Sequence, residues 1–429
     1  MNEIPIPPGM NTKKFIMSSG AIADTPELLK EVFPGKKAFI IADDNTMEAA
    51  GFELLEHLKT ANIEVAGTII YPGSERLHCE NDIAIDIASK YPENIVPIAV
   101  GSGTINDLVK RASEIAQIPY CCVATACSVD GYTSNGSALT YNGFKQTMPA
   151  TAPLAVVADS NILATAPDEM RAAGYADLTA KLPGGADWLL VDTLGMEPIV
   201  PHIWDLVQTK LKDNLSDPLD YQKIFDGLVA TGYAMQLYAD SRPASGAEHM
   251  FSHVWEMENL SFNGEPVSHG FKVAIGTLIS TLLMEYVIYT DVENARRKAQ
   301  AGKTREERMA EIESLLDKDI YGNEQVKKVA MEKFLTGVDL AGRRELIYRH
   351  WETIQNCFKK QIYSYKELVA KLEAAKCPTK PSQIGLTKEQ FFHGVRTAQL
   401  IRKRYTILDM LYDAGLFDDA VATLEFFAK

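Results

Sequence analysis

Three side chains that lie far apart in the sequence have types that together can bind a metal ion. Asp177 lies in AAGYADLTAK, His249 in GAEHMFSHVWEME and His269 in VSHGFKVAIGTL. One carboxylate and two imidazoles suit a divalent cation such as zinc or nickel, and three protein ligands leave one coordination position open for a substrate. The residue types therefore predict an open metal site.

Each of these side chains also has a structural alternative, since a lone histidine is more often structural than functional. GAEHMFSHVWEMEN is typical of a helix, so His249 and His253, four residues apart, share one face. His253 is then a second ligand, a proton carrier or a substrate contact. The H-E-x-x-H protease pattern is absent because Met250 follows His249. Asp177 lies in an apolar helix, where a buried carboxylate is costly without a cation; alternatively it pairs with Lys181.

A glycine-rich turn, GSGTINDLVK, follows an apolar run well before the metal candidates. Gly101 and Gly103 permit a tight turn and a close approach of backbone to a pyrophosphate. The helix that begins at Thr104 offers its amide end to an anion. A dinucleotide fingerprint has a third glycine where this chain has Asn106, and Asp107 would also favour the helix dipole. Nucleotide binding and an ordinary strand–helix turn both remain open.

An acidic pair in IIADDNTMEAAG falls at the end of another apolar run. A carboxylate at the C-terminal edge of a strand can hold ribose hydroxyls. Asp43 or Asp44 can equally cap the helix that follows, and capping is the expected role of at least one of them.

The stretch VATACSVDGYTSNGSAL is rich in small polar residues. Asp130 offers a carboxylate to a substrate hydroxyl, and three hydroxyls can donate to a cofactor, those of Thr125, Ser128 and Ser134. A plain hairpin or surface loop is the alternative. Farther along, Arg242 in DSRPASG either caps a loop or binds a substrate phosphate.

The elements that must position these residues alternate over the first part of the chain. Apolar runs predict strands at 36–44, 63–72, 94–103, 118–126 and 153–163, and amphipathic stretches predict helices at 45–61, 80–91 and 104–116. Such alternation predicts parallel βαβ units, whose strands bind ligands at their C-terminal ends.

From about residue 165 the pattern becomes helical, with apolar residues every three or four positions and no convincing strand. The predicted helices lie at 170–182, 221–239, 246–260, 269–289, 344–375 and 387–416, and 293–316 is typical of a solvated helix pair. We therefore expect an α/β dinucleotide-binding domain over 1–160 and a helical metal- and substrate-binding domain over 161–429.

Composition limits the function classes. The 429 residues carry 43 basic and 57 acidic side chains, a net charge of −14, which argues against a nucleic-acid binder. Six cysteines without a CxxC pair favour reduced thiols and a cytoplasmic protein. The N-terminus lacks a signal-peptide pattern, and no apolar run reaches the ~18 residues of a membrane span.

The strings GSGTIND, SVDGYTSNGSAL, AGYADLTAK, SRPASGAEHMFSHVWEME and SHGFKVAIGTL resemble a known superfamily. It contains metal-dependent glycerol dehydrogenases, iron-type alcohol dehydrogenases, dehydroquinate synthases and sn-glycerol-1-phosphate dehydrogenases. The strings are most similar to the last group, and within it to the bacterial enzymes associated with arabinose operons. The resemblance covers roughly residues 35–285, and it implies a Rossmann-like domain followed by an all-α domain with the active site between them.

The resemblance also implies residue roles. Asp177, His249 and His269 match the metal ligands, with nickel or zinc as the metal, and Asp130, Asp177 and His253 match the catalytic and substrate-binding positions. The implied NAD contacts are Asp44, Gly101, Gly103, Thr104, Ile105, Asn106, Asp107, Thr125, Ala126, Cys127, Ser128 and Ser134. The acidic pair would repel a 2′-phosphate and so favours NAD over NADP, although the family often accepts both.

The activity implied by the resemblance is the interconversion of dihydroxyacetone phosphate and sn-glycerol 1-phosphate, with hydride passing to or from the nicotinamide. The product would be a phospholipid precursor, and a cytoplasmic homodimer is expected. Three alternatives stay open: a glycerol dehydrogenase, a dehydroquinate-synthase-like lyase, and a non-catalytic nucleotide-binding protein on the same scaffold.

Overall fold

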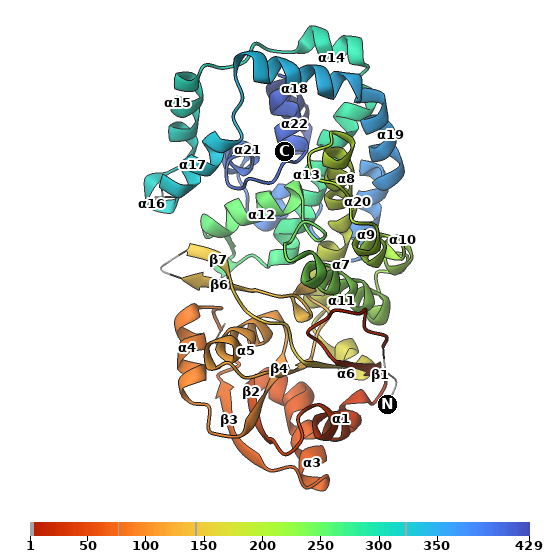
Figure 1. The fold of residues 1–429 in the computed structure, drawn as a ribbon, viewed down its shortest axis with the longest axis vertical. Helices are drawn as coiled ribbons and strands as arrows, with labels where there is room; N and C mark the ends of the chain where they lie inside the picture. Colours follow the sequence, from red (N-terminus) through yellow and green to blue (C-terminus); the bar gives the residue numbers. More distant parts are fainter. Residues whose placement is uncertain (1–3, 76, 142–143, 322–323) are drawn as a thin grey trace. The chain divides into compact units, whose positions relative to one another are not determined.

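The structure is a computed structural model that describes residues 4–75, 77–141, 144–321 and 324–429 (Figure 1). The chain divides into two compact units. Unit 1 comprises Met1–Leu178 and Lys212–Ser241, and unit 2 comprises Thr179–Leu211 and Arg242–Lys429. The predicted domain ranges, 1–160 and 161–429, stay a prediction about which part binds which ligand.

Unit 1 is built on a six-stranded sheet with the order β1-β8-β5-β4-β2-β3, in which every pair of neighbours is parallel. The strands are β1 (Lys14–Ser18), β2 (Lys37–Asp43), β3 (Val65–Tyr71), β4 (Ile95–Gly101), β5 (Cys121–Ala124) and β8 (Ala155–Asp159). The predicted α/β fold class is confirmed. All the predicted strands form, and β1 is an additional strand that the sequence did not indicate.

Helices connect these strands. Those of unit 1 are α1 (Thr25–Val32), α2 (Asp44–Thr46), a π-helical turn (Met47–Gly51), α3 (Phe52–Thr60), α4 (Asn81–Ser89), α5 (Gly103–Ala116), α6 (Ser160–Thr165), α7 (Asp168–Thr179) and α11 (Tyr221–Tyr238), with the short α10 (Leu211–Asn214) at the point where the chain returns from unit 2. Aliphatic residues of β2, β4, β5 and β8 pack with α1 and α3 in one buried core, as expected for strands covered by helices.

An antiparallel hairpin is inserted in the chain between β5 and β8 and forms a separate two-stranded sheet. Its strands, β6 (Ser137–Tyr141) and β7 (Phe144–Met148), follow the polar stretch around Asp130. The Ser137 hydroxyl donates to the Asp107 carbonyl at 2.5 Å, and the buried Lys110 ammonium donates to the carbonyls of Gly131 and Gly136 at 2.7 and 3.1 Å. Helix α5 therefore fastens both the hairpin and the polar loop before it.

Unit 2 is helical, as predicted. Its helices are α8 (Lys181–Thr193), α9 (Pro201–Gln208), α12 (Ala247–Met257), α13 (His269–Tyr289), α14 (Val292–Lys298), α15 (Arg305–Leu315), α16 (Lys318–Tyr321), α17 (Glu324–Glu332), α18 (Gly337–Arg349), α19 (Trp351–Gln361), α20 (Tyr365–Ala374), α21 (Lys388–Ala398), α22 (Ile407–Asp413) and α23 (Phe417–Ala422). The expectation of no strand is corrected by one small hairpin, β9 (Ser261–Phe262) with β10 (Glu265–Pro266), which the positive-φ residues Asn263 and Gly264 close.

Helix α13 is the central helix of unit 2. Among the described residues, α13 alone is long and apolar enough to cross a membrane, judged by length and composition only. However, 72% of its apolar 18-residue stretch is buried within the fold. Such burial is typical of a core helix. Gly276 allows α12 to lie directly against it, because a Cβ at this position would stand 2.2 Å from the Glu248 carbonyl oxygen.

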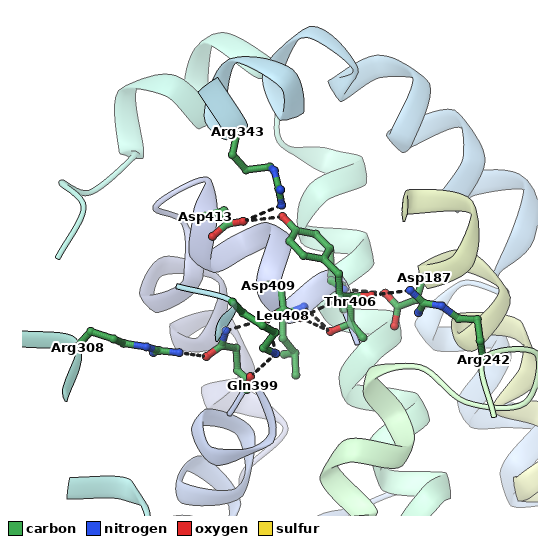
Figure 2. A network of polar contacts seen from close by, with 12 residues as sticks. Asp187, Arg242, Arg308, Arg343, Gln399, Thr406, Leu408, Asp409 and Asp413 are labelled. Carbon is green, nitrogen blue, oxygen red and sulfur yellow. Dashed lines mark hydrogen bonds and ion pairs between the residues drawn. The ribbon is translucent and has the colours of Figure 1, made fainter. Parts of the chain in front are cut away.

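A polar network joins the last helices of unit 2 to α8 (Figure 2). Asp187 of α8 accepts hydrogen bonds from the amides of Ala247 and Ile407 at 2.8 and 2.7 Å. Its carboxylate therefore caps both α12 and α22. Asp409 accepts from the Gln399 side chain at 2.8 Å and from the Thr406 amide at 3.0 Å. The start of α12 is thus fixed by buried hydrogen bonds to distant segments.

Candidate active site

Three imidazoles gather in unit 2. The ring centroids of His249 and His269 lie 5.5 Å apart, and the ring of His253 lies 6.3 Å from each of them. His249 and His253 are one turn apart on α12, as predicted, and His269 opens α13, whose first turn the Ser268 hydroxyl caps. The close packing of α12 on α13 therefore brings together the histidines that the sequence singled out.

Two carboxylates orient these imidazoles, that of Glu248 fully buried and that of Glu256 largely buried. Glu248 Oε1 lies 2.9 Å from His249 Nδ1, and Glu256 uses one oxygen for each of the other rings, 2.7 Å from His269 Nδ1 and 3.3 Å from His253 Nδ1. Because a carboxylate only accepts hydrogen bonds, each Nδ1 carries a proton and each Nε2 keeps its lone pair. This carboxylate–histidine arrangement is characteristic of imidazoles that bind a metal.

The titratable groups of this cluster shift one another's pKa values. Burial alone would raise the pKa of Glu256, but the neighbouring His269, His253 and Lys272 hold it well below its usual value. Burial lowers the pKa of His253 to about 4, against the opposing effect of the hydrogen bond that this ring donates to Glu256, and the charges of Arg402 and His249 lower it further. Glu256 is therefore ionised and His253 neutral at physiological pH.

Asp177 lies in unit 1, near the end of α7, and is fully buried. Its Oδ2 accepts a hydrogen bond from the backbone amide of Asp130 at 3.0 Å. The polar loop can approach this helix because position 174 is glycine, where a Cβ would stand 1.8 Å from the Cys127 carbonyl oxygen. Two residues predicted to act on the substrate, Asp130 and Asp177, are thus neighbours within unit 1.

The predicted phosphate turn forms at the junction of β4 and α5. Gly101 ends the strand, Gly103 begins the helix, and the N-cap Ser102 makes no side-chain capping bond. The first amides of α5 are therefore not closed by their own N-cap, as an anion-binding helix end requires. Of the other residues predicted there, Ile105 is buried in the core and Thr104 follows Gly103 in the first turn.

Asn106 and Asp107 are engaged inside the protein. The Asn106 amide donates to the Gly131 carbonyl at 3.3 Å and accepts from the Tyr120 hydroxyl at 3.0 Å, while Asp107 forms an ion pair of 3.3 Å with Lys110. Asn106 thus binds both the polar loop and Tyr120, just before β5, and Asp107 pairs with the lysine that holds the loop. Their role in cofactor binding stays a prediction.

The two residues of the acidic pair, Asp43 and Asp44, make different contacts. Asp43 caps α2 by accepting from the Thr46 amide at 2.7 Å, so the predicted capping role belongs to this residue. Asp44 Oδ2 accepts from the Gly73 amide at 3.0 Å, which joins the ends of β2 and β3. The carboxylate proposed for ribose thus lies at the C-terminal edge of the sheet, where parallel sheets bind ligands.

The remaining predicted cofactor residues line the loop after β5. Thr125, Ala126, Cys127, Ser128 and Ser134 are all buried. The Tyr132 hydroxyl donates to the Ala126 carbonyl at 2.5 Å and lies 3.3 Å from Ser128 Oγ, and Ser134 Oγ donates to the Gly131 carbonyl at 3.3 Å. Burial raises the pKa of the Cys127 thiol to about 12, so this thiol is not a nucleophile at neutral pH.

Sequence reasoning missed the residues that hold the site in place. Glu248 and Glu256 orient the histidines, Lys110 fastens the polar loop, and Asp187 caps the start of α12. The one available signal was spacing, since Glu256 lies three residues after His253 on the same helix face.

Comparisons with known proteins identify similar sequences. Residues 16–167 match the profile of the iron-containing alcohol dehydrogenases. The glycerol-1-phosphate dehydrogenase [NAD(P)+] of Geobacillus thermodenitrificans is 36% identical over 254 residues, which cover 57% of this chain and 63% of that protein. The enzyme of the same name from Bacillus subtilis is 34% identical over 254 residues, 56% of this chain and 64% of its own. The match thus spans less than two thirds of either relative.

Solved structures share the fold over nearly the whole chain. The glycerol dehydrogenase of Schizosaccharomyces pombe superposes with a TM-score of 0.61 at 15% identity, covering 100% of this chain and 92% of that one. The iron-containing alcohol dehydrogenase of Thermotoga maritima gives 0.56 at 12% identity, covering 96% and 98%. The predicted fold class and the superfamily resemblance are both confirmed.

Proposed function

Because the chain has the iron-type alcohol dehydrogenase fold and is similar in sequence to glycerol-1-phosphate dehydrogenases, we propose that it is a metal-dependent oxidoreductase linked to NAD(P). Its reaction would be the reduction of dihydroxyacetone phosphate to sn-glycerol 1-phosphate and the reverse. For this chain the proposal depends on its own residues.

The observation that carries the proposal is the imidazole cluster with its carboxylates. His249 and His269 each have Nδ1 held by a glutamate, so that Nε2 keeps its lone pair, which is the state a metal ligand needs. We propose that Asp177, the carboxylate of the predicted ligand set, completes the metal site with His249 and His269. The donor set of one oxygen and two nitrogens fits zinc or nickel.

When bound, the metal would act as a Lewis acid that polarises the C2 oxygen of the substrate, and the nicotinamide would supply or accept the hydride. The residues of this chain do the rest. His253 is held by Glu256 through Nδ1, and its Nε2 would exchange a proton with a substrate hydroxyl. Asp130, whose position the Asp177 carboxylate fixes, would accept a hydrogen bond from another hydroxyl.

The dinucleotide would bind along the C-terminal ends of the strands in unit 1. The amide end of α5 beyond Gly101 and Gly103 offers an anion site to the pyrophosphate. Asp44 would accept from a ribose hydroxyl, and its charge disfavours a 2′-phosphate, so we propose NAD as the preferred cofactor. Comparing KM for NADH and NADPH tests this preference.

One set of assays decides among the candidate functions. The full-length protein, loaded with nickel or zinc, is mixed with NADH and either dihydroxyacetone phosphate, dihydroxyacetone or no ketone. Oxidation with the phosphate ester alone, or with a strong preference for it, supports the proposal. Preference for dihydroxyacetone would favour a glycerol dehydrogenase instead. No ketone-dependent oxidation with any loaded metal would contradict both enzymatic assignments.

Three finer points belong to the same proposal. The metal is nickel or zinc, which elemental analysis of protein purified without chelators would distinguish. The protein is a cytoplasmic homodimer, which sedimentation of the purified protein and fractionation of cells would test. The product serves as a phospholipid precursor, which labelled glycerol 1-phosphate would reveal if its label enters the lipid fraction.

A further inference from the structure

A partly open cavity in unit 2 is formed by residues that the proposed reaction does not use. It encloses about 270 Å³ and is lined by the segment before α15 and by α18, through Gly302, Lys303, Gly337, Leu340, Ala341 and Arg344. A narrower hollow of about 40 Å³ shares four of these residues and extends to Tyr412 and Phe417. Ligand pockets are typically roughly 300 Å³ or larger, so the larger volume suits a small metabolite.

Two carboxylates that line the narrower hollow already have cationic partners. Asp413 Oδ2 lies 3.5 Å from Arg343 Nη1 and accepts from the Tyr405 hydroxyl at 2.9 Å (Figure 2). Asp418 Oδ1 accepts from Arg396 Nη1 at 2.6 Å. These two acidic side chains therefore add no unbalanced negative charge to the cavity.

The third carboxylate, that of Glu311, is shared by two cations. Lys303 Nζ donates to Oε1 at 2.6 Å, and Arg308 Nη1 donates to Oε2 at 2.8 Å. One negative charge thus faces two positive charges. Because an ammonium has three N–H donors, Lys303 can bind Glu311 and still donate to a ligand in the cavity that it lines.

Arg344 supplies a further positive charge. Its Nε donates to the Asp413 carbonyl at 2.7 Å, which fixes the side chain at the end of α22. Among the residues that the structure describes, neither Nη1 nor Nη2 of Arg344 has a hydrogen-bond or ion-pair partner. Gly415 leaves room for this guanidinium, because a Cβ there would stand 2.9 Å from Nη2. The cavity therefore contains a guanidinium that is held in place by backbone and not neutralised by a carboxylate.

We propose that this cavity binds a small phosphorylated metabolite whose phosphate is held by Arg344 and Lys303. The group of Lys303, Arg308 and Glu311 has one positive charge in excess, and Arg344 adds a second. Together they match a phosphate monoester, which carries about −1.5 to −2 at pH 7. The Nη atoms of a guanidinium offer parallel N–H donors that fit phosphate oxygens, and the buried Leu340 offers an apolar wall to the rest of the ligand.

The first test titrates the full-length protein with inorganic phosphate in a calorimeter. Arg344→Gln should weaken one binding event at least about 10-fold, as the loss of charge-assisted hydrogen bonds implies. Arg349→Gln is the matched control, because Arg349 is an exposed residue of the same helix that does not line the cavity. It should bind phosphate as wild type does. Equal affinities in the two glutamine variants would overturn the assignment.

A second pair of variants leaves Arg344 and its bond to Asp413 in place. Ala341 is exposed, lines the cavity and lies three residues before Arg344 on α18. Ala341→Glu therefore brings a carboxylate within reach of the guanidinium, and phosphate binding should weaken as in Arg344→Gln. Ala341→Gln has the same size without the charge and should bind phosphate more tightly than Ala341→Glu. Equal binding by these two variants would overturn the role of the guanidinium charge.

Kinetics separate this cavity from the active site of the proposed function. KM for dihydroxyacetone phosphate should be the same in Arg344→Gln and in wild type, since no residue of the cavity is a proposed ligand, cofactor contact or substrate contact. A rise in KM that parallels the loss of phosphate binding would place the substrate at Arg344 and overturn a separate site. If wild type reduces no ketone but the calorimetric difference persists, the proposed reaction fails and the phosphate site stands.

Discussion

His269 Nδ1 and Glu256 Oε1 lie 2.7 Å apart, between the first residue of α13 and the last turn of α12. The same carboxylate reaches His253 with its other oxygen. A proposed metal ligand and a proposed proton carrier are thus oriented by one side chain, which is itself 10% exposed. Any change at Glu256 must therefore act on both imidazoles at once.

Glu256→Gln should weaken metal binding by about 10- to 100-fold, the usual effect of losing a carboxylate behind a metal-binding histidine. The amide keeps the size of the side chain but gives each Nδ1–H a poorer acceptor or a competing donor. The measurement is the metal dissociation constant, obtained by competition with a chromogenic chelator.

Glu258→Gln is the matched control for this variant. Glu258 lies one residue beyond α12 and contacts the Tyr321 hydroxyl and His393, which are not among the proposed ligands. Its replacement should leave the metal constant unchanged. Equal metal affinities in the two variants would show that Glu256 has no part in orienting the ligands.

His249→Ala should retain its fold but lose its metal on dialysis, together with turnover, because two ligands cannot replace a set of three. Circular dichroism checks that the fold is retained, and elemental analysis after dialysis measures the metal content. His57→Ala, at a partly exposed histidine of α3 that pairs with Glu53, is the control and should keep both. Normal metal content in His249→Ala would refute the ligand assignment.

Much of the fold followed from local patterns. The run KKAFIIADD predicts β2 because its residues are apolar on both faces, as in a strand covered on both sides. Strand β1 was not predicted because KFIMS is short and begins with a charged residue. Its position in the sheet also depends on pairing with β8, more than a hundred residues away in the chain. Such non-local pairing leaves no periodic signal.

The sequence predicted the proposed ligands of the site but not the residues that hold them in place. The spacing of His249 and His253 on one helix face is a local property, so the sequence indicated it. The contact of Glu256 with His269 depends on α12 lying against α13, which in turn requires Gly276. The role of Asp187 depends on two helices that begin 160 residues apart in the chain, at Ala247 and Ile407. Tertiary packing alone creates these contacts.

Gly174→Ala should destabilise the protein by about 1–3 kcal/mol, since the new Cβ would stand 1.8 Å from the Cys127 carbonyl oxygen and the loop must move. The shift would also break the bond from the Asp130 amide to Asp177, so activity should fall with stability. Chemical unfolding and a rate assay measure the two effects.

Gly342→Ala is the control for this substitution, because Gly342 lies within α18 and a Cβ there meets nothing within 4 Å. Removing a helical glycine in open space should raise the free energy of unfolding by about 0.4–1 kcal/mol. If Gly174→Ala behaved like Gly342→Ala, the close approach of the loop to α7 would be wrong.

Asp187 predicts a dependence of stability on pH. Burial, and next the charge of Glu248, raise the pKa of Asp187 to about 8. A raised pKa means that the folded state holds a proton that the unfolded state releases near pH 4. The contribution to stability is therefore complete below pH 4 and is lost as pH rises to 8, at up to ~1.4 kcal/mol per pH unit.

Asp187→Asn removes this titration, so its free energy of unfolding should vary less between pH 5 and 8 than that of wild type. At pH 5 the variant should be about 1–3 kcal/mol less stable, because one amide oxygen cannot accept from both Ala247 and Ile407 as well as two carboxyl oxygens do. Urea unfolding at several pH values measures the free energy of unfolding and its dependence on pH.

Asp192→Asn, at an exposed position of the same helix, is the control. Its free energy of unfolding should depend on pH as that of wild type does. Parallel curves for Asp187→Asn and wild type would mean that Asp187 is ionised throughout, and the shared capping of α12 and α22 would then depend on a buried charge rather than on a protonated carboxyl.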